Sequence, residues 1–168
     1  MPKENTNLKR VFMFVNVDWF FISHRLPIAQ NAQKYDMQIT VFTDKTQSDI
    51  SFESFKFDML QSPLSRSTRN YFLFLWELLK SFFLISKNKP DLIHAVTIKP
   101  IILLGIISRI TKTPFLGAIS GLGPVVNYRT TWQKVRFLFV IYLYRFIFNS
   151  NKSAVICQNH NDKDILLK

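Results

Sequence analysis

The segment PDLIHAVTIKPIILLGIISRITKTPFLGAISGLG, residues 90–123, contains two short apolar runs separated by a stretch of helical length. The runs are Leu92–Val96 and Phe115–Ile119, and each leads into polar or glycine residues. Between them, Pro100–Thr111 has the spacing of a helix. This strand–helix–strand pattern is typical of a parallel sheet, in which ligands bind beyond the carboxyl ends of the strands.

The rest of the chain continues this alternation of strands and helices. Further strands are predicted at Val11–Val15, Gln38–Thr43, Phe52–Leu60 and Ser153–Gln158. Further helices are predicted at Ser23–Tyr35, Asn70–Lys87, Thr131–Asn149 and, after a turn, within 159–168, with Ser23 and Thr131 as caps. The order predicts an α/β fold, a single Rossmann-like doubly wound parallel sheet over residues 10–168 after a polar lead-in, 1–9.

Charge is distributed unevenly along the 168 residues. The formal net charge is +11, and no Asp or Glu lies between Ala95 and Asn161. Such a balance predicts an anionic partner, whether nucleic acid, an anionic membrane face or a phosphorylated substrate, although a solvated basic face is the alternative. Cys157 is the only cysteine, so no disulfide is predicted. No uninterrupted apolar run reaches the ~18 residues of a spanning helix.

Candidate ligand residues follow the strands of the opening segment. His94, Thr97, Lys99 and the Gly121–Gly123 loop are all predicted at the carboxyl edge. His94 can donate a hydrogen bond to a phosphate or a sugar hydroxyl. Lys99 adds a positive charge where the free N–H groups of a helix start already favour anions. The alternatives are a structural histidine and an ordinary tight turn.

The turn after the first strand offers Asp18, Trp19, His24 and Arg25. It contains no glycine and therefore lacks the G-x-G-x-x-G of dinucleotide-binding enzymes. The structural alternative makes Asp18 a turn or capping residue and Trp19 a cover over the core. The three histidines are far apart and lack ligand spacing, so neither a metal nor another cofactor is predicted. No G-x-S-x-G nucleophile motif is present.

The segment Thr131–Asn149 is both aromatic and basic. Basic residues beside Tyr and Trp are typical of a membrane interface, so Arg136, Arg145 and Lys152 are predicted to face an anionic membrane surface. The alternative is a helix that only packs on the sheet. Nucleic acid competes as a partner on charge alone, but no recognisable binding motif supports it, and we expect none.

Four segments in this order, FVNVDWFFISHRLPIA, KPDLIHAVTIKP, AISGLG and VICQNHND, resemble the amino-terminal domain of bacterial family 4 glycosyltransferases. The resemblance extends from about Arg10 to the end of the chain. It implies one half of a GT-B fold, the half that binds the acceptor, here a lipid-linked polyprenyl-diphosphate glycan of surface polysaccharide synthesis. It also implies that His94 reaches the donor sugar or its phosphate and that the first loop lines the acceptor side. Such enzymes, when retaining, need no metal.

The sequence departs from the family pattern after the first domain. The donor domain, which holds the nucleotide sugar through a pair of Glu residues, is absent from these 168 residues. We therefore expect the chain to be inactive alone and to need a second domain or subunit. The resemblance implies a cytoplasmic protein, peripheral on the inner face of the cytoplasmic membrane. The alternative is a non-catalytic α/β module that binds an anionic lipid or a partner protein.

Overall fold

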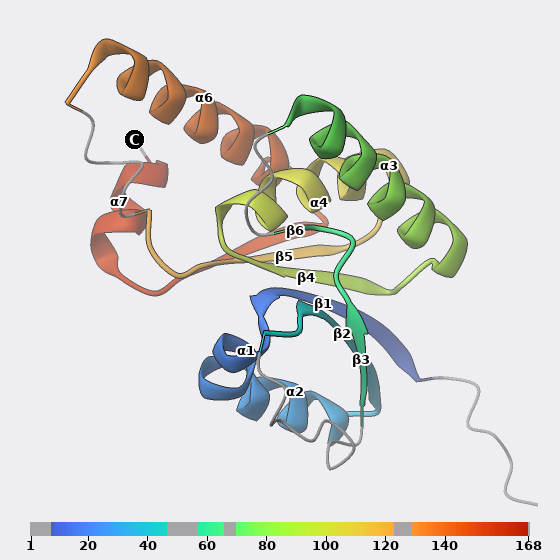
Figure 1. Ribbon diagram of the computed structural model, residues 1–168. Coiled ribbons are helices and arrows are strands. Elements are labelled where there is room, and N and C mark those ends of the chain that lie inside the picture. Colours follow the sequence, from blue (N-terminus) through green and yellow to red (C-terminus); the bar gives the residue numbers. More distant parts are fainter. Residues whose placement is uncertain (1–7, 47–56, 66–69, 123–128, 168) are drawn as a thin grey trace, which may run out of the picture.

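The computed structural model describes residues 8–46, 57–65, 70–122 and 129–167, and it shows one sheet of six parallel strands (Figure 1). The strand order is β3-β2-β1-β4-β5-β6. The strands are β1 (Lys9–Val17), β2 (Met37–Asp44), β3 (Asp58–Gln61), β4 (Leu92–Val96), β5 (Phe115–Ile119) and β6 (Ser153–Cys157). The predicted α/β fold with a single Rossmann-like parallel sheet is confirmed.

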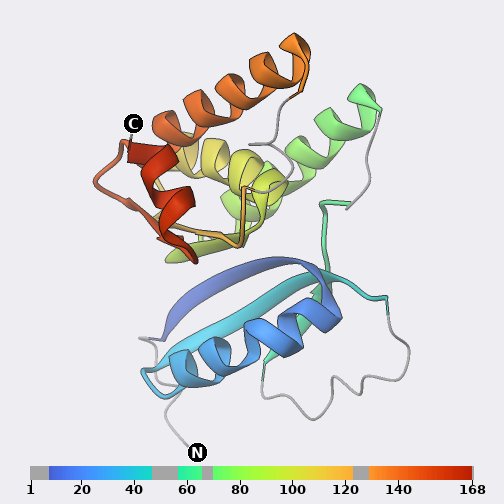
Figure 2. The same cartoon turned by 90° about the vertical axis from the view of Figure 1, so that its left-hand side faces the viewer.

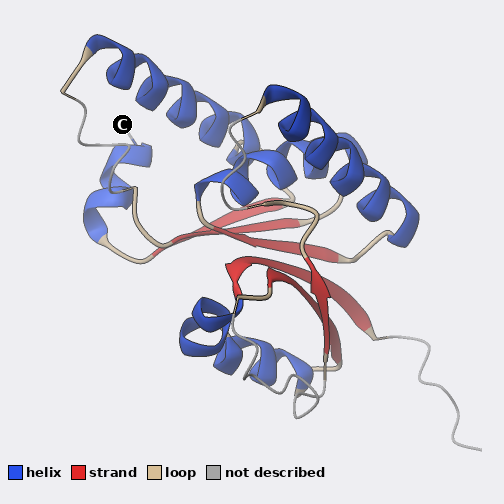
Figure 3. Cartoon of the chain, viewed as in Figure 1, coloured by secondary structure: helices blue, strands red, loops and turns tan. Residues whose placement is uncertain are grey.

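Helices pack on both faces of the sheet (Figure 3). One face is covered by α3 (Tyr71–Asn88), α4 (Ile98–Thr111) and α6 (Thr131–Phe148), and the other, over β1 to β3, by α1 (Asp18–His24) and α2 (Leu26–Gln33). A last helix, α7 (His160–Leu167), follows β6. Each face has its own core, one around Phe14, Ile101 and Tyr144 and one around Met13 and Phe21. The apolar run of β1 is buried because both faces of the sheet are covered there, and the runs of β4 and β5 are buried beneath α4.

The first helical segment differs most from its prediction. Helix starts at Asp18, not Ser23, so most of the residues assigned to the turn are helical. The helix then breaks at Arg25, whose φ of −121° and ψ of −19° are not helical, and Pro27 falls in the first turn of α2, where its missing N–H costs nothing. The sequence signal for this break is Pro27, which is tolerated only in the first turn of a helix, so a helix has to begin near Arg25.

Smaller differences concern caps and one strand. The cap of α6 is Thr130 rather than Thr131, and Thr130 forms a reciprocal capping box with Gln133. The described part of the predicted strand Phe52–Leu60 is β3, and residues 52–56 lie outside the described residues. Cys157 is half-buried and packs against the larger core.

Helix α3 turns its polar residues inward. Glu77 and Ser81 are buried, whereas the neighbouring Lys80 is exposed. The Glu77 carboxylate lies 2.6 Å from Lys99 Nζ and accepts a hydrogen bond from the backbone N–H of Ser65. The Ser81 hydroxyl donates to the Glu77 carbonyl at 2.8 Å. Buried polar groups need such partners, and these contacts fix the rotation of α3 about its axis.

Helices α4 and α6 approach each other closely at Gly105. A Cβ placed on Gly105 would lie 2.6 Å from Ile147 Cγ2, and Ile147 is fully buried. We predict that Gly105→Ala destabilises the fold by about 1–3 kcal/mol through overpacking, in spite of the ~1 kcal/mol that alanine gains in helix propensity. Urea unfolding measures the change in the free energy of unfolding.

The double variant Gly105→Ala with Ile147→Ala tests the cause of this loss. Because Ile147→Ala removes the clashing atoms, the double variant should lose clearly less stability than the sum of the two single variants. Additive losses would show that the contact between Gly105 and Ile147 does not limit the packing of α4 on α6.

Candidate functional site

His94 lies in the middle of β4, between Met13 of β1 and Leu116 of β5, rather than at the end of its strand. Its side chain is 3% exposed, and its Nδ1 lies 3.2 Å from the carbonyl oxygen of Leu116. A carbonyl oxygen only accepts, so Nδ1 carries the proton in this contact. Burial and then the positive charge of Arg25 lower the pKa of His94 to about 4. The ring is therefore neutral at pH 7.

A neutral ring that is protonated on Nδ1 has a lone pair on Nε2. Nε2 of His94 is buried and has no hydrogen-bond partner among the described residues. His94 can therefore accept a hydrogen bond from a ligand hydroxyl, whereas the sequence alone suggested that it donates. This change of role follows from the Leu116 carbonyl and from the nearby charge of Arg25, which the sequence does not place.

Arg25 stands at the break between α1 and α2 and is 4% exposed. Its Nε and Nη2 atoms are buried and find no acceptor within the described part of the chain. Burial also lowers the pKa of the guanidinium, although the group stays charged at neutral pH. Because the charge of Arg25 acts on the pKa of His94, these two buried residues belong to the same region of the structure.

The other three residues of the first turn have different surroundings. Asp18 is fully buried, and its carboxylate accepts hydrogen bonds from the backbone N–H and the hydroxyl of Thr46, at 2.8 and 2.6 Å. Asp18 therefore ties the start of α1 to the segment after β2. Trp19 is 44% exposed, and the exposed His24 stacks on Phe20. A substrate contact by Trp19 or His24 stays a prediction.

Thr97 and Lys99 lie at the start of α4, as predicted. Thr97 is its N-cap residue, with a φ of +74°, which is strained for a β-branched residue, and its hydroxyl is buried without a hydrogen-bond partner among the described residues. Lys99 Nζ contacts the Glu77 carboxylate and donates to the Ser65 carbonyl at 2.7 Å. The charge of Lys99 is thus compensated within the protein, and its contact with a phosphate stays a prediction.

The glycine loop after β5 connects to the end of the chain. Gly121 has a φ of +143° and open space around it, whereas Gly123 lies outside the described residues. Beside Gly121, the backbone N–H of Leu122 donates to the buried Asp162 carboxylate at 3.1 Å. Sequence reasoning missed Asp162, although Asn159 and Asp162 have the three-residue spacing of a capping pair and form reciprocal hydrogen bonds.

The predicted membrane-facing residues do not gather at one place. Arg136 and Arg145 are exposed on α6. Lys152 follows α6, and its Nζ donates to the Lys112 carbonyl at 3.2 Å. This contact lies at the edge of the sheet opposite the carboxyl ends of the strands. Within the described ranges, no helix is both long enough and apolar enough to cross a bilayer.

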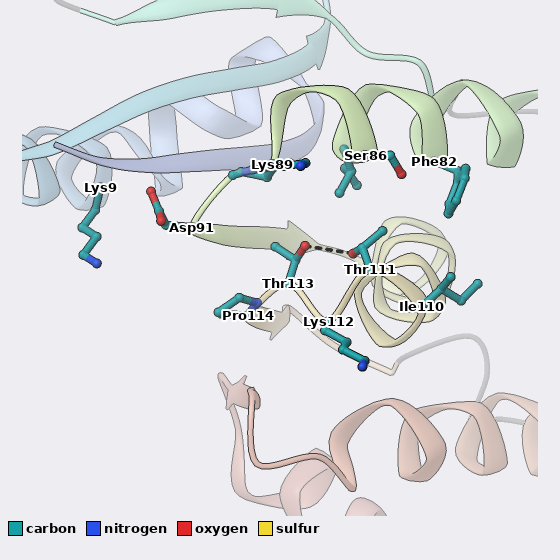
Figure 4. Close-up of a pocket in the computed structure, with 12 residues that line it drawn as sticks. Lys9, Phe82, Ser86, Lys89, Asp91, Ile110, Thr111, Lys112, Thr113 and Pro114 are labelled. Atoms are coloured by element: carbon teal, nitrogen blue, oxygen red, sulfur yellow. Dashed lines mark hydrogen bonds between the residues drawn. The ribbon is translucent and has the colours of Figure 1, made fainter. Parts of the chain in front are cut away.

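A surface hollow also lies at that opposite edge, where α3 and α4 end (Figure 4). Lys9, Asp91 and Thr113 line it, together with Lys89 and Lys112, which end the two helices in the left-handed conformation. The nearby Arg10 Nη2 donates to the Lys89 carbonyl at 2.9 Å. Cations stabilise the carbonyl end of a helix. The lysines around this hollow are therefore best explained as residues that stabilise the ends of α3 and α4.

Comparisons with known proteins identify the family. The model of the Glycosyl transferase 4-like family matches residues 10–159. The chain belongs to this family. A search of curated protein sequences found no match.

Solved structures of low sequence identity share the fold. A glycosyltransferase from Rickettsia africae ESF-5 aligns with a TM-score of 0.70 and 13% identity over 96% of this chain and 40% of that one. A UDP-N-acetylglucosamine 2-epimerase aligns at 0.66 and 12% over 96% and 45%. The sucrose-phosphate synthase of Thermosynechococcus elongatus aligns at 0.61 and 15% over 95% and 44%. The glycosyl transferase 4-like chain therefore spans less than half the length of these neighbours, as expected for one half of a GT-B fold.

The described residues contain no cluster of three or more His, Cys, Asp or Glu side chains that could hold a metal ion. The carboxylates of Asp18, Glu77 and Asp162, which lie at or beside candidate site residues, are all engaged with protein groups. Among the candidate site residues, those with buried side-chain atoms that have no hydrogen-bond partner in the described part of the chain are His94, Arg25 and Thr97.

The lowered pKa of His94 predicts a pH-dependent stability. The unfolded chain protonates this histidine near pH 6.5, and the folded chain only near pH 4. Between these values the unfolded state binds more protons, so the free energy of unfolding falls as the pH falls. His94 accounts for a loss of up to about 3 kcal/mol, complete near pH 4.

Urea unfolding of the wild type and of His94→Asn at pH 7 and pH 4.5 measures this effect. Asparagine keeps an N–H close to the Leu116 carbonyl but does not titrate, so the variant should lose less stability on acidification. Equal losses in both proteins would contradict the lowered pKa.

Proposed function

We propose that this glycosyl transferase 4-like chain is the acceptor-side half of an enzyme that moves a sugar from a nucleotide sugar to a lipid-linked glycan. The single observation that supports it most is the presence of buried, unpartnered polar atoms on Arg25 and His94 in a chain of this family. Buried polar groups in native proteins are normally paired, and those that are not often belong to ligand sites. A polyprenyl-diphosphate glycan of surface polysaccharide synthesis is the acceptor that we propose.

A second domain would supply what these residues lack. The Asp18 and Glu77 carboxylates hold Thr46 and Lys99, so neither is available to bind the ribose or sugar hydroxyls of a donor. The chain spans 40% to 45% of the three structural neighbours named above. We therefore propose that the nucleotide sugar binds between residues 10–168 and a donor domain, which either continues this polypeptide or comes from a second subunit.

The lipid part of the acceptor has a suitable surface on α3 and α6. The α3 stripe is formed by apolar side chains that are 40–84% exposed: Phe72, Leu75, Trp76, Leu79 and Phe83. The α6 stripe, at helical spacing, consists of Trp132, Val135, Phe139, Tyr142 and Phe146, which are 44–83% exposed. In Figure 2 the amino-terminal turns of α3 and α6 extend to the same side of the molecule. Exposed apolar areas of this kind mark interaction sites.

The charge near both stripes favours an anionic lipid surface. Lys80 lies over the Trp76 ring at 5.3 Å, and Arg136 lies one helical turn from both Trp132 and Phe139. Among α3, α4 and α6, the only acidic residue is Glu77, which is buried and paired with Lys99. If two copies of this chain associated through these stripes, their basic residues would repel each other. We therefore propose peripheral binding to the inner face of the cytoplasmic membrane.

The same exposed stripes support a second candidate function, a non-catalytic module that binds an anionic lipid or a partner protein. The two functions differ in what happens when a donor domain is present. A module would bind lipid but would transfer no sugar.

Reconstitution tests the enzyme. The chain alone should transfer no sugar to a polyprenyl-diphosphate acceptor, and a separately produced donor domain of the same family should be inactive as well. The mixture should transfer sugar, and His94→Phe should abolish this transfer because phenylalanine has no lone pair to accept a hydrogen bond. Radiolabelled sugar in the lipid extract measures the product. Transfer by the chain without a donor domain would contradict the proposal.

Liposome sedimentation tests the membrane surface. Neutralising Arg136 and Arg145 to Gln should weaken binding to anionic vesicles about 30-fold, because each basic contact contributes ~1 kcal/mol. The matched control is the pair Lys34→Gln and Lys163→Gln, which removes the same charge from exposed positions on other elements and should bind as the wild type does. Equal weakening by both pairs would show an effect of net charge alone.

A further inference from the structure

The two edge strands of the sheet, β3 and β6, differ in how their free edges are protected. β3 carries the exposed charge of Asp58, and the Gln61 side chain donates to the Asp44 carboxylate. β6, Ser153–Cys157, contains neither a charge nor a proline, and its register on β5 has no bulge. Among the described residues, no strand pairs with its outer edge. Charges, prolines and bulges prevent edge strands from pairing, so β6 can accept a further strand.

The backbone groups of β6 point alternately towards β5 and away from the sheet. The Phe115 N–H donates to the Lys152 carbonyl at 2.8 Å, and Phe115 pairs with Ser153 in the register. In a parallel ladder this pattern directs the backbone groups of residues 154 and 156 to β5, whereas those of Val155 and Cys157 point outward. Lipid chains cannot satisfy such groups, but another strand can.

The side chains in the middle of β6 are apolar and exposed. Val155 and Ile156 are 39% and 42% exposed, and Ala154 is exposed as well. Ala154 and Ile156 share a face of the sheet with Leu116 and Ala118, their register partners in β5. Helices α1 and α2 cover this face only over β1 to β3 (Figure 1). An added strand would bury these side chains together with the backbone edge.

The outer edge of β6 is complementary to itself. When two β6 strands run antiparallel with Val155 opposite Val155, each Val155 exchanges both backbone hydrogen bonds with its counterpart. In the same register, the Cys157 N–H meets the Ser153 carbonyl of the other copy. Within residues 152–158 the only charged side chain is Lys152, which lies opposite Gln158. No like charges therefore lie directly opposite each other.

We propose that two copies of this chain pair through β6 into a dimer with one continuous sheet, in which Val155 lies on the two-fold axis. The pairing closes both unprotected edges and leaves the β3 strands, with Asp58, at the two ends of the joined sheet. The contact is symmetric, so the assembly stops at two copies.

The symmetry has a consequence for the exposed stripes. Antiparallel pairing sets the two-fold axis perpendicular to the sheet, so α3, α4 and α6 of both copies lie on one side of it. The α3 and α6 stripes of both copies are then available to one membrane surface, which would hold the dimer more tightly than a monomer. This consequence rests on the proposed membrane binding, whereas the dimer itself does not.

The dimer is expected to be weak. A pairing of five residues is smaller than the ~1,200–2,000 Å² of a stable interface, and each copy carries a net charge of +11. We expect a dissociation constant on the order of 0.1 mM at about 0.15 M salt. Higher salt should strengthen the dimer, because salt screens the repulsion between the two copies.

Sedimentation equilibrium of the full chain at rising protein concentration, in low and high salt, tests the dimer. The average mass should rise from 19.8 kDa towards twice that value. Val155→Lys, which places like charges on the two-fold axis, should stay monomeric. The matched control is Leu60→Lys, the same substitution at an exposed apolar residue of β3, and it should dimerise. A monomeric wild type at about ten times the expected dissociation constant, an unaffected Val155→Lys dimer, or equal loss in both variants would overturn the proposal.

Amide hydrogen exchange tests the register without a variant. As the protein concentration rises, exchange at the Val155 and Cys157 amides should slow, whereas exchange at Ala154 and Ile156, which bond to β5, should not change. Adding a donor domain distinguishes the occupants. Protection of Val155 that appears only with that domain, in a chain that stays monomeric, would show that β6 binds the donor domain and would refute the dimer.

Disulfide trapping tests the two-fold axis. In a Cys157→Ser background, Val155→Cys should form a linked dimer on mild oxidation, because hydrogen-bonded antiparallel partners have Cα atoms about 5.5 Å apart. Ala154→Cys in the same background should link poorly, since its counterpart lies at a diagonal distance of ~7–8 Å. Equal trapping at both positions would contradict the register.

Discussion

The ion pair between Glu77 and Lys99 links the fold, the candidate site and the surface of this protein. Its two charged atoms lie 2.6 Å apart, and the Glu77 residue is 7% exposed. Leaving the buried Glu77 carboxylate without Lys99 would be strongly unfavourable, so α3 must turn Glu77 towards α4. The Ser65 backbone joins the same pair, with its N–H on Glu77 and its carbonyl on Lys99. One buried carboxylate thereby holds a helix, a helix start and a loop together.

The rotation of α3 that buries Glu77 leaves apolar side chains exposed on the opposite side of the helix. Because Glu77, Ser81 and Ile85 occupy the buried face, the α3 stripe of Phe72 to Phe83 remains in contact with water. The helix is thus apolar where it is exposed and partly polar where it is buried, the reverse of an ordinary surface helix. An apolar stripe kept exposed by a buried ion pair is most simply explained by a function outside the domain, and α6 shows a second stripe of the same kind.

The ion pair also separates two cations at the candidate site. Lys99 is neutralised by Glu77, whereas Arg25 has no corresponding partner for Nε and Nη2 in the described residues. The positive charge that is available to a ligand therefore lies in the break between α1 and α2. Burial and, after it, the charge of Arg25 lower the pKa of His94, so the imidazole is neutral and its Nε2 is an acceptor.

The sequence by itself determined the sheet, the order of its elements and the family. Buried parallel strands such as Leu92–Val96 are short apolar runs that local pattern reveals, and the four quoted segments carry the family resemblance. Only the tertiary structure decided the chemistry of the site and the surface. The pairing of Lys99 with Glu77 and the proton position on His94 both depend on residues distant in the chain. The periodicity of apolar and polar residues shows that the two sides of a helix differ in polarity. Which side is buried is decided by the element that packs against the helix.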